Sequence, residues 1–151
     1  MPLYDQGDDY DSPELYGGSS FSGDFTMAQT PCKKVGGAGC AIDYTAGSDL
    51  AAGKVIVIGT TPMIVEVDVV SGALAALATT GLWDIPKVSG AITAGTALYW
   101  DADADPVGGT SGSGAATATD TGNSLLGIAA LAAANGDEMV RVLLMQQAVL
   151  P

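Results

Sequence analysis

The sequence predicts an all-β protein, a small barrel or sandwich with an extended N-terminal arm. Short runs rich in β-branched and aromatic residues recur at spacings near ten residues, which suggests roughly seven strands. Glycine accounts for 21 of the 151 residues and separates these runs. No apolar pattern keeps a helical period for more than about two turns. These features are typical of short strands joined by tight turns.

Residues 1–30 are expected to form an acidic arm, and residues 31–151 a β-rich domain. The arm has no Lys or Arg, and its Pro and Gly residues break any regular period. Disordered segments usually contain few aromatic residues, yet this one holds both Phe and three of the five Tyr. It is either a passive tail or an arm that inserts its rings into a neighbour. The candidate contact residues are Tyr4, Tyr10, Leu15, Tyr16, Phe21 and Phe25.

The first half of the domain is expected to hold four strands. Residues 40–45 form the first, and the β-branched run at 54–58 lies between glycines. Residues 63–70 give the clearest pattern, because acidic residues alternate with valines at period two. Residues 73–78 are rich in alanine, which also favours helices, but the run is short and is interpreted as a strand.

The second half begins with residues 81–90, where Pro86 indicates a sheet edge or a strand end, since proline cannot donate to a ladder. Residues 107–122 are almost entirely Gly, Ser, Thr and Ala, and are expected to form a loop or a weakly structured flap. Further strands are expected at 96–100, 124–131 and 139–145, the last two as an antiparallel pair.

Charge and composition argue against several classes of partner. Seventeen acidic residues against five basic ones give a net charge of −12, which repels nucleic acid. No apolar run approaches the length of a membrane span, and the acidic start does not resemble a secretory signal. We therefore expect neither nucleic acid nor a membrane as a partner.

Nothing in the sequence supports catalysis or a cofactor. The absence of His removes the usual general base and the commonest metal ligand. The Asp-x-Asp-x-Asp pattern at 101–105 resembles the opening of a calcium loop, but Pro106 and Gly112 stand where that loop needs Gly and Glu. A solvated turn is the favoured interpretation. The glycine-rich stretch lacks the Gly-Lys-Ser/Thr of a phosphate-binding loop. We expect no enzyme, no catalytic residues, no cofactor and no metal site.

A series of motifs in the body resembles the capsid cement, or decoration, proteins of tailed bacteriophages. The most specific is the segment Gly81-Leu-Trp-Asp-Ile-Pro-Lys87 followed by the strand ending in Leu98-Tyr-Trp-Asp101. The resemblance covers residues 40–146. Domains of this family are sometimes called recombinase-like, but the phosphate-binding loop that such an enzyme needs is missing here. The remaining motifs lie at 49–59, 91–97, 126–130 and 136–142.

The resemblance implies a structural virion protein on the outer surface of a phage capsid, made in the host cytoplasm. Its partners would be the major capsid protein, whose capsomers it bridges, and itself, as a homotrimer. Two other functions stay open: a virion-surface module that binds a receptor or glycan, and a subunit of a tail tube or of the head–tail joint.

Two groups of body residues remain as candidates. The heavy side chains Trp83, Ile85, Tyr99 and Trp100 form either the core or a subunit interface, where Trp and Tyr are enriched. Cys32 and Cys40 bracket a short loop that a disulfide could close. Synthesis in the cytosol argues against this bond, and release of a particle into an oxidising medium argues for it.

Overall fold

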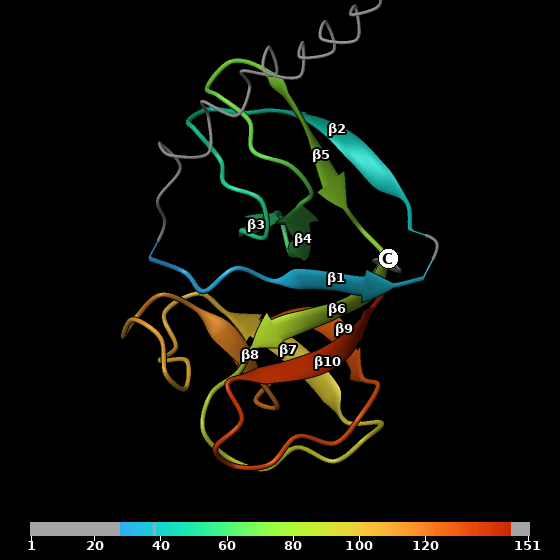
Figure 1. The fold of residues 1–151 in the computed structure, drawn as a ribbon, viewed down its shortest axis with the longest axis vertical. Coiled ribbons are helices and arrows are strands. Elements are labelled where there is room, and N and C mark those ends of the chain that lie inside the picture. Colours follow the sequence, from blue (N-terminus) through green and yellow to red (C-terminus); the bar gives the residue numbers. More distant parts are fainter. Residues whose placement is uncertain (1–27, 38, 146–151) are drawn as a thin grey trace, which may run out of the picture.

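A computed structural model describes residues 28–37 and 39–145, and it is all-β, as predicted. The strands form two antiparallel sheets, and the described residues contain no helix (Figure 1). The arm residues proposed as contacts, Tyr4 to Phe25, lie outside the described part. The strands are β1 (Lys33–Gly36), β2 (Ala41–Thr45), β3 (Val55–Ile58), β4 (Thr61–Val65), β5 (Leu74–Ala78), β6 (Gly81–Pro86), β7 (Ala97–Asp101), β8 (Ala115–Thr117), β9 (Ser124–Ala129) and β10 (Met139–Leu144).

The larger sheet has six strands in the order β1-β6-β10-β9-β7-β8, and the smaller has four in the order β2-β5-β4-β3. In the view of Figure 1 the smaller sheet lies above the larger one. The larger sheet curves so far that β8 reaches the end of β6. There Lys87 forms an isolated parallel bridge with Ala116, and the Val88 amide donates to the Ala116 carbonyl at 3.1 Å.

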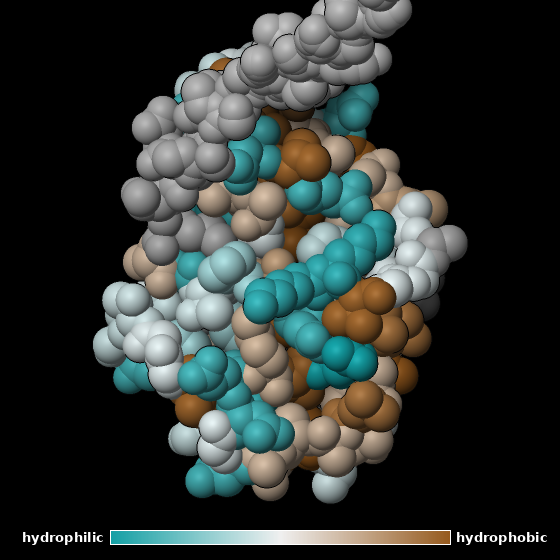
Figure 2. Space-filling model, viewed as in Figure 1, coloured by the Kyte–Doolittle hydropathy of each residue, from teal (hydrophilic) through white to brown (hydrophobic). Residues whose placement is uncertain are grey.

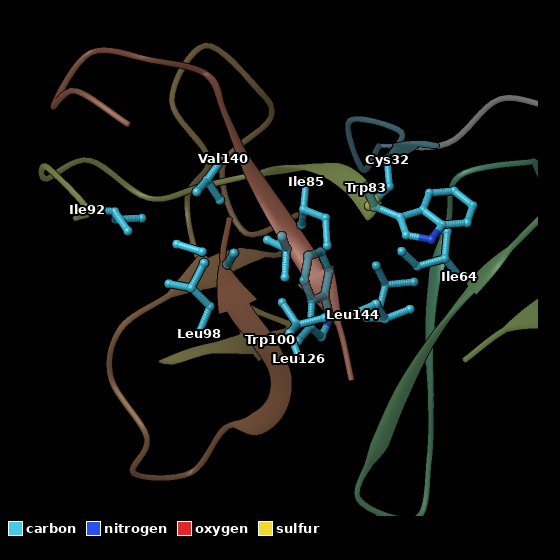
Figure 3. Packing of buried hydrophobic residues seen from close by; sticks show 14 of the residues in the cluster. Cys32, Ile64, Trp83, Ile85, Ile92, Leu98, Trp100, Leu126, Val140 and Leu144 are labelled. Carbon is cyan, nitrogen blue, oxygen red and sulfur yellow. The ribbon is translucent and has the colours of Figure 1, made fainter. Parts of the chain in front are cut away.

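The main core lies inside the curved sheet and extends to the smaller one. Ile85, Leu98 and Leu126 have no exposed surface, and they belong to one cluster with Trp83 of β6 and Ile64 of β4 (Figure 3). Strand alternation explains this in β6 and β7, where every second residue points inward. In β9 a register shift opposite Leu98 and Tyr99 interrupts the alternation, so that Leu126 and Ala129 both enter the core. Ile64 therefore joins the two sheets through buried apolar surface.

The smaller sheet is also buried on its other face. Met63 and Leu77 point away from the larger sheet and pack in a second cluster with Leu50 and Val69. Those two residues come from the segments that flank the sheet and pair with each other as an isolated bridge. As a result, Met63, Ile64 and Val65 of β4 are all buried, although their side chains alternate between the two faces.

Most predicted strands are confirmed, but the strand with the clearest pattern, at 63–70, was predicted too long. Strand β4 ends at Val65, not Val70. The Glu66 amide still bonds to the Ala76 carbonyl at 3.0 Å, after which the chain leaves the sheet. Val69 is buried against Leu50, whereas Val67 is 57% exposed. Beyond Val65 the alternating valines therefore do not mark a paired strand. They mark a segment that returns to the core at Val69 only.

The prediction of a loop over 107–122 is wrong in its middle, because β8 lies there and all of its residues are buried. Small side chains permit this. A side chain at Gly114 would collide with the Trp100 ring, and Ala116 sits in the core cluster. Strand β1, paired with β6, was also missed. Pro86 does mark a strand end, but β6 is not an edge, since it lies between β1 and β10.

Candidate functional site

The heavy side chains of the body separate into two groups. Trp83, Ile85 and Trp100 are at most 5% exposed and belong to the main core cluster. Tyr99 is only partly buried, because its neighbours Leu98 and Trp100 take the inward positions of β7. Of the four, Tyr99 is the residue that a neighbouring protein could contact.

The outward-facing side of the six-stranded sheet, here called the outer face, carries an apolar patch. Leu143 of β10 is paired with Leu82 of β6 on one side and with Ile128 of β9 on the other. Residues opposite each other in an antiparallel pair share a face, so these three side chains adjoin. Leu143 is 42% exposed. Figure 2 shows hydrophobic and hydrophilic residues interleaved over the lower half of the molecule, where β6 and β10 lie.

One ion pair crosses this face beside the leucines. Arg141 lies opposite Asp84 and donates from Nε to Oδ1 at 2.8 Å and from Nη2 to Oδ2 at 3.0 Å. This fork matches the carboxylate in two places, which fixes both side chains. The hydrogen bonds from Arg141 to Asp84 raise the guanidinium pKa further above its ordinary value. The outer face therefore combines an apolar patch with a fixed polar group.

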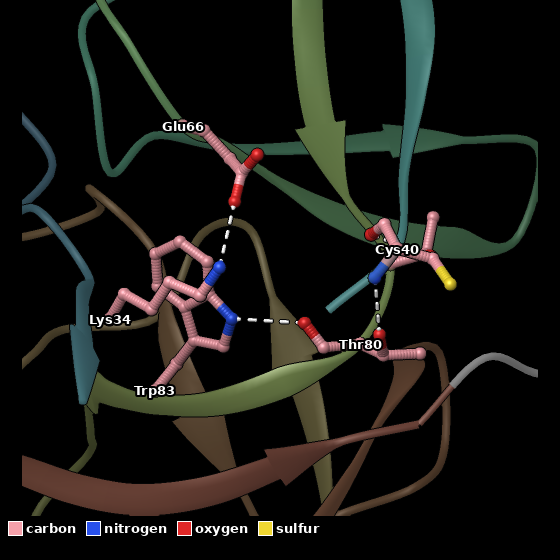
Figure 4. Close-up of polar contacts among 6 residues, drawn as sticks. Lys34, Cys40, Glu66, Thr80 and Trp83 are labelled. Atoms are coloured by element: carbon pink, nitrogen blue, oxygen red, sulfur yellow. Dashed lines mark hydrogen bonds and ion pairs between the residues drawn. The ribbon is translucent and has the colours of Figure 1, made fainter. Parts of the chain in front are cut away.

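A second polar group lies where the two sheets meet (Figure 4). The Lys34 ammonium of β1 is 3.2 Å from Glu66 Oε1 and lies 5.9 Å from the centre of the Trp83 ring. The Trp83 indole donates to the Thr80 carbonyl at 3.3 Å, and the Thr80 hydroxyl accepts from the Cys40 amide at 2.8 Å. These contacts hold the entry to β2 and the exit of β4 against the larger sheet.

Lys87 is buried, and no carboxylate in the described part of the chain forms an ion pair with it. It has no exposed surface, and its ammonium donates to the carbonyls of Val88 at 3.0 Å, Gly90 at 2.9 Å and Asn135 at 3.3 Å. The Asn135 side chain accepts in turn from the Gly90 amide at 2.7 Å. Burial lowers the pKa of Lys87, and the nearby Asp137 carboxylate partly offsets this. Lys87 therefore fastens two loops at one end of the larger sheet.

The two cysteines are free thiols in the structure, so the disulfide considered for them is not formed there. Cys32 is 5% exposed and packs in the core, and its amide donates to the Gly53 carbonyl at 2.9 Å. Cys40 is exposed and is held by Thr80 instead. Burial raises the pKa of the Cys32 thiol well above its ordinary range.

The acidic pattern at 101–105 organises a turn. Asp105 Oδ1 accepts hydrogen bonds from the Ser111 hydroxyl and the Gly112 amide, both at 2.7 Å, and these bonds lower the Asp105 pKa. Asp101 accepts from the Asp103 amide at 3.1 Å. Across residues 28–37 and 39–145, no three acidic, Cys or His side chains come close enough to hold a metal ion.

Gln29 has a structural role that the sequence does not reveal. Its side chain accepts from the Val55 amide at 3.0 Å and donates to the Gly53 carbonyl at 3.1 Å. Gln29 is 8% exposed. Its hydrogen bonds attach the end of the predicted arm to the edge of β3 that faces away from β4. A cavity of about 350 Å³ opens beside it, lined by Ala28, Gln29, Lys54, Val55, Trp100, Ala102 and Ser113.

Comparison with known proteins assigns the family. Residues 37–144 match the model of the phage cement protein family. No curated protein and no solved structure matches the chain. In the part that the structure describes, no helix is long and apolar enough to cross a bilayer. Since the family model spans more than half of the chain, this chain belongs to the phage cement protein family and is a structural component of a phage capsid.

Proposed function

We propose that the protein binds the outer surface of a phage capsid and stabilises the shell by bridging neighbouring capsomers. The observation that carries this proposal is the family match over residues 37–144. The major capsid protein would be its partner, and no catalysis is needed. A bridge adds contact that must be broken before the capsomers separate, and each 100 Å² of buried apolar surface contributes roughly 2.5 kcal/mol before ordering costs.

The body offers surfaces suited to such contact. Leu143 on the outer face is 42% exposed, Leu131 in the loop after β9 is 54% exposed, and Leu74 of the smaller sheet is 66% exposed. The arm residues Tyr4 to Phe25 would add aromatic contacts. A homotrimer would present several such surfaces at once, and repetition over a whole shell turns a modest local gain into a large one.

Binding to isolated capsids tests the proposal. The full chain is added at increasing concentration to expanded heads that lack it, and bound copies are counted by gel densitometry and located by cryo-electron microscopy. We expect saturable binding on the exterior at positions between capsomers, together with a higher temperature of shell disruption. Absence of binding, or binding that leaves shell disruption unchanged, would contradict the proposal.

Removal of residues 1–27 distinguishes the contribution of the arm to capsid binding from that of the body. If the arm contributes contacts, the truncated chain reaches half-occupancy only at a concentration about tenfold higher, as expected for a loss of about 1.4 kcal/mol. Equal occupancy for both chains would contradict a binding role for the arm and leave the body as the binding unit. The mass of the isolated full chain in solution tests the trimer.

A further inference from the structure

The two sheets have four edge strands, and two of them are plainly obstructed. Natural edges are blocked by lysines, bulges, short length or covering groups. Strand β1 carries two lysines and a bulge between Lys34 and Gly36. Strand β8 has three residues, and its Ala116 carbonyl already accepts from the Val88 amide. Neither edge offers a clear row of main-chain groups.

The third edge, β3, is covered along its first half. The Gln29 side chain bonds to the Val55 amide and the Gly53 carbonyl on the side that faces away from β4. Beyond Val55 the strand has three residues and then turns back into β4. What remains of this edge is too short to pair with a strand of ordinary length.

The fourth edge, β2, has no lysine, bulge or covering group among the described residues, and its one charged residue is Asp43. It contains no Lys, Pro or Gly, and its pairing with β5 runs through all five residues without a bulge. Four of the five residues are exposed, and Ile42 is 41% exposed. Figure 1 shows β2 along the outer margin of the smaller sheet. Ile42, Tyr44 and Thr45 are also types that favour strands.

Alternation of hydrogen bonds shows which groups of β2 are open. The Cys40 carbonyl and the Ala46 amide both bond toward β5, each at 2.9 Å. In an antiparallel pair this direction alternates, so the amides and carbonyls of Ala41, Asp43 and Thr45 point away from the sheet. Within the described residues, no hydrogen bond reaches these three amides. They form an evenly spaced row that an added strand could pair with.

We propose that β2 accepts an extended strand of a capsid subunit, and that this strand places a Lys or Arg beside Asp43. The identity of the partner rests on the proposed function. The charge follows from Asp43, which lies at the middle of the edge and has no ion-pair partner among the described residues. Opposite charges on adjacent strands stabilise pairing, and like charges oppose it.

The same charge argues against the two occupants that this chain could supply. Pairing of β2 with β2 of a second copy about its centre would put Asp43 opposite Asp43, between molecules of net charge −12. The N-terminal arm is acidic and has no Lys or Arg. A cationic segment of another protein fits this edge better than either.

Two substitutions test the edge with the full chain and expanded heads. Thr45→Pro removes an outward amide and keeps the bonds to β5, because the Thr45 amide points away from the sheet. Asp43→Lys reverses the charge at the centre. We expect each to raise the concentration for half-occupancy about tenfold, and Asp43→Lys also to abolish the salt dependence that this contact gives to wild-type binding.

Matched controls separate this effect from charge and from proline. Asp103→Lys makes the same charge change at an exposed turn. Thr121→Pro places proline at the second position of a turn whose third residue, Gly122, has φ of +81°, where proline is favoured. Both controls should bind like wild type. Circular dichroism and melting confirm folding, and if Thr45→Pro unfolds the chain, Asp43→Lys alone decides.

Hydrogen exchange gives an independent measurement. On heads, the peptide that covers residues 41–45 should exchange at least tenfold more slowly than in the free protein. If wild type binds while both variants bind equally well, the proposal for β2 is overturned and the proposed function stands. If wild type does not bind, the proposed function fails first. Loss of self-association in Thr45→Pro would instead identify a second copy as the occupant and overturn the proposal.

Discussion

The two sheets of this protein meet solvent in opposite ways. The six-stranded sheet buries one face around the core and leaves its outer face, with Leu143 and the Arg141–Asp84 pair, to the surroundings. The four-stranded sheet packs on both faces, against the larger sheet and against the segments that hold Leu50 and Val69, and this packing buries Met63, Ile64 and Val65 of β4. What it presents to the surroundings is the edge strand β2, together with exposed side chains such as Leu74. One body thus offers two kinds of contact, side chains on a face and main-chain groups on an edge.

The largest expected loss of stability comes from a substitution at the centre of the larger sheet. Gly127 of β9 has φ of +155°, and an added Cβ would collide with the Leu143 carbonyl. We expect Gly127→Ala to break the pairing of β9 with β10 and to destabilise the protein by about 4 kcal/mol or more. Chemical unfolding measures this change.

Gly36→Ala is the matched control, because no atom of residues 28–37 or 39–145 lies within 4 Å of the new Cβ and β1 is an edge strand. It should change stability by less than about 1 kcal/mol. If both substitutions had the same effect, the distinction between the centre and the edge of this sheet would be lost.

Removal of the Lys87 ammonium should have the next largest effect. Lys87→Met leaves the carbonyls of Val88, Gly90 and Asn135 without their shared donor, and we expect a loss of about 3 kcal/mol in urea unfolding. Lys33→Met, at an exposed position of the same sheet, should stay within about 0.5 kcal/mol of wild type. An equal effect at both sites would show that the buried lysine does not fasten the loops.

Lys87 also predicts a pH dependence. Its pKa is lowered in the folded protein and returns to about 10.5 in the unfolded chain. Between these two values the unfolded chain binds the additional proton, so stability from this group rises with pH through that window. Urea titrations across it should show the rise in wild type and in Lys33→Met. Its persistence in Lys87→Met would assign it to another group.

The labelling rates of the two thiols compare a core residue, Cys32, with a residue next to an edge strand, Cys40. Burial raises the pKa of Cys32, so little thiolate forms, and access is blocked as well. Cys40 is exposed and immediately precedes β2. We expect Cys40 to react about 100-fold faster, and Cys40→Ser to abolish fast labelling while Cys32→Ser preserves it. A mass two units below that of the reduced chain would instead reveal the disulfide.

The smallest expected effect concerns the joint between the sheets. The Lys34 and Glu66 side chains are 42% and 28% exposed, and ion pairs this accessible contribute about 0.5 kcal/mol. A double-mutant cycle with Lys34→Ala and Glu66→Ala should give a coupling energy of that size. A coupling above about 2 kcal/mol would mean that polar contacts, more than Ile64 in the shared core, hold the sheets together.

The local sequence pattern predicted a strand correctly wherever residues that favour strands are also paired in a sheet. The β-branched run at 54–58 and the final pair at 124–131 and 139–145 correspond to β3, β9 and β10. Prediction failed where pairing depends on distant residues. Strand β8 is made of small residues that give no strand signal, and only the structure shows the tight space beside Trp100 that the preceding Gly114 permits. The valines at 67 and 69 repeat a strand pattern after the ladder has ended.

The candidate site was less predictable than the fold. Trp83 and Trp100 stood out by size, but only the register of β6 and β7 shows that they point inward and leave Tyr99 partly exposed. Gln29 and Lys87 acquire their roles from groups far along the chain, at Gly53 and Asn135. No local pattern encodes such contacts.

The sequence by itself determined the all-β class, the acidic charge and, through an ordered series of motifs, the family. These depend on side-chain periodicity and residue identity, which are local properties. Only the tertiary structure decided which strands lie at edges and which face each sheet exposes. Edge position is a property of pairing between segments distant in sequence, so β2 is identified as the open edge only once β1, β3 and β8 are seen to be obstructed.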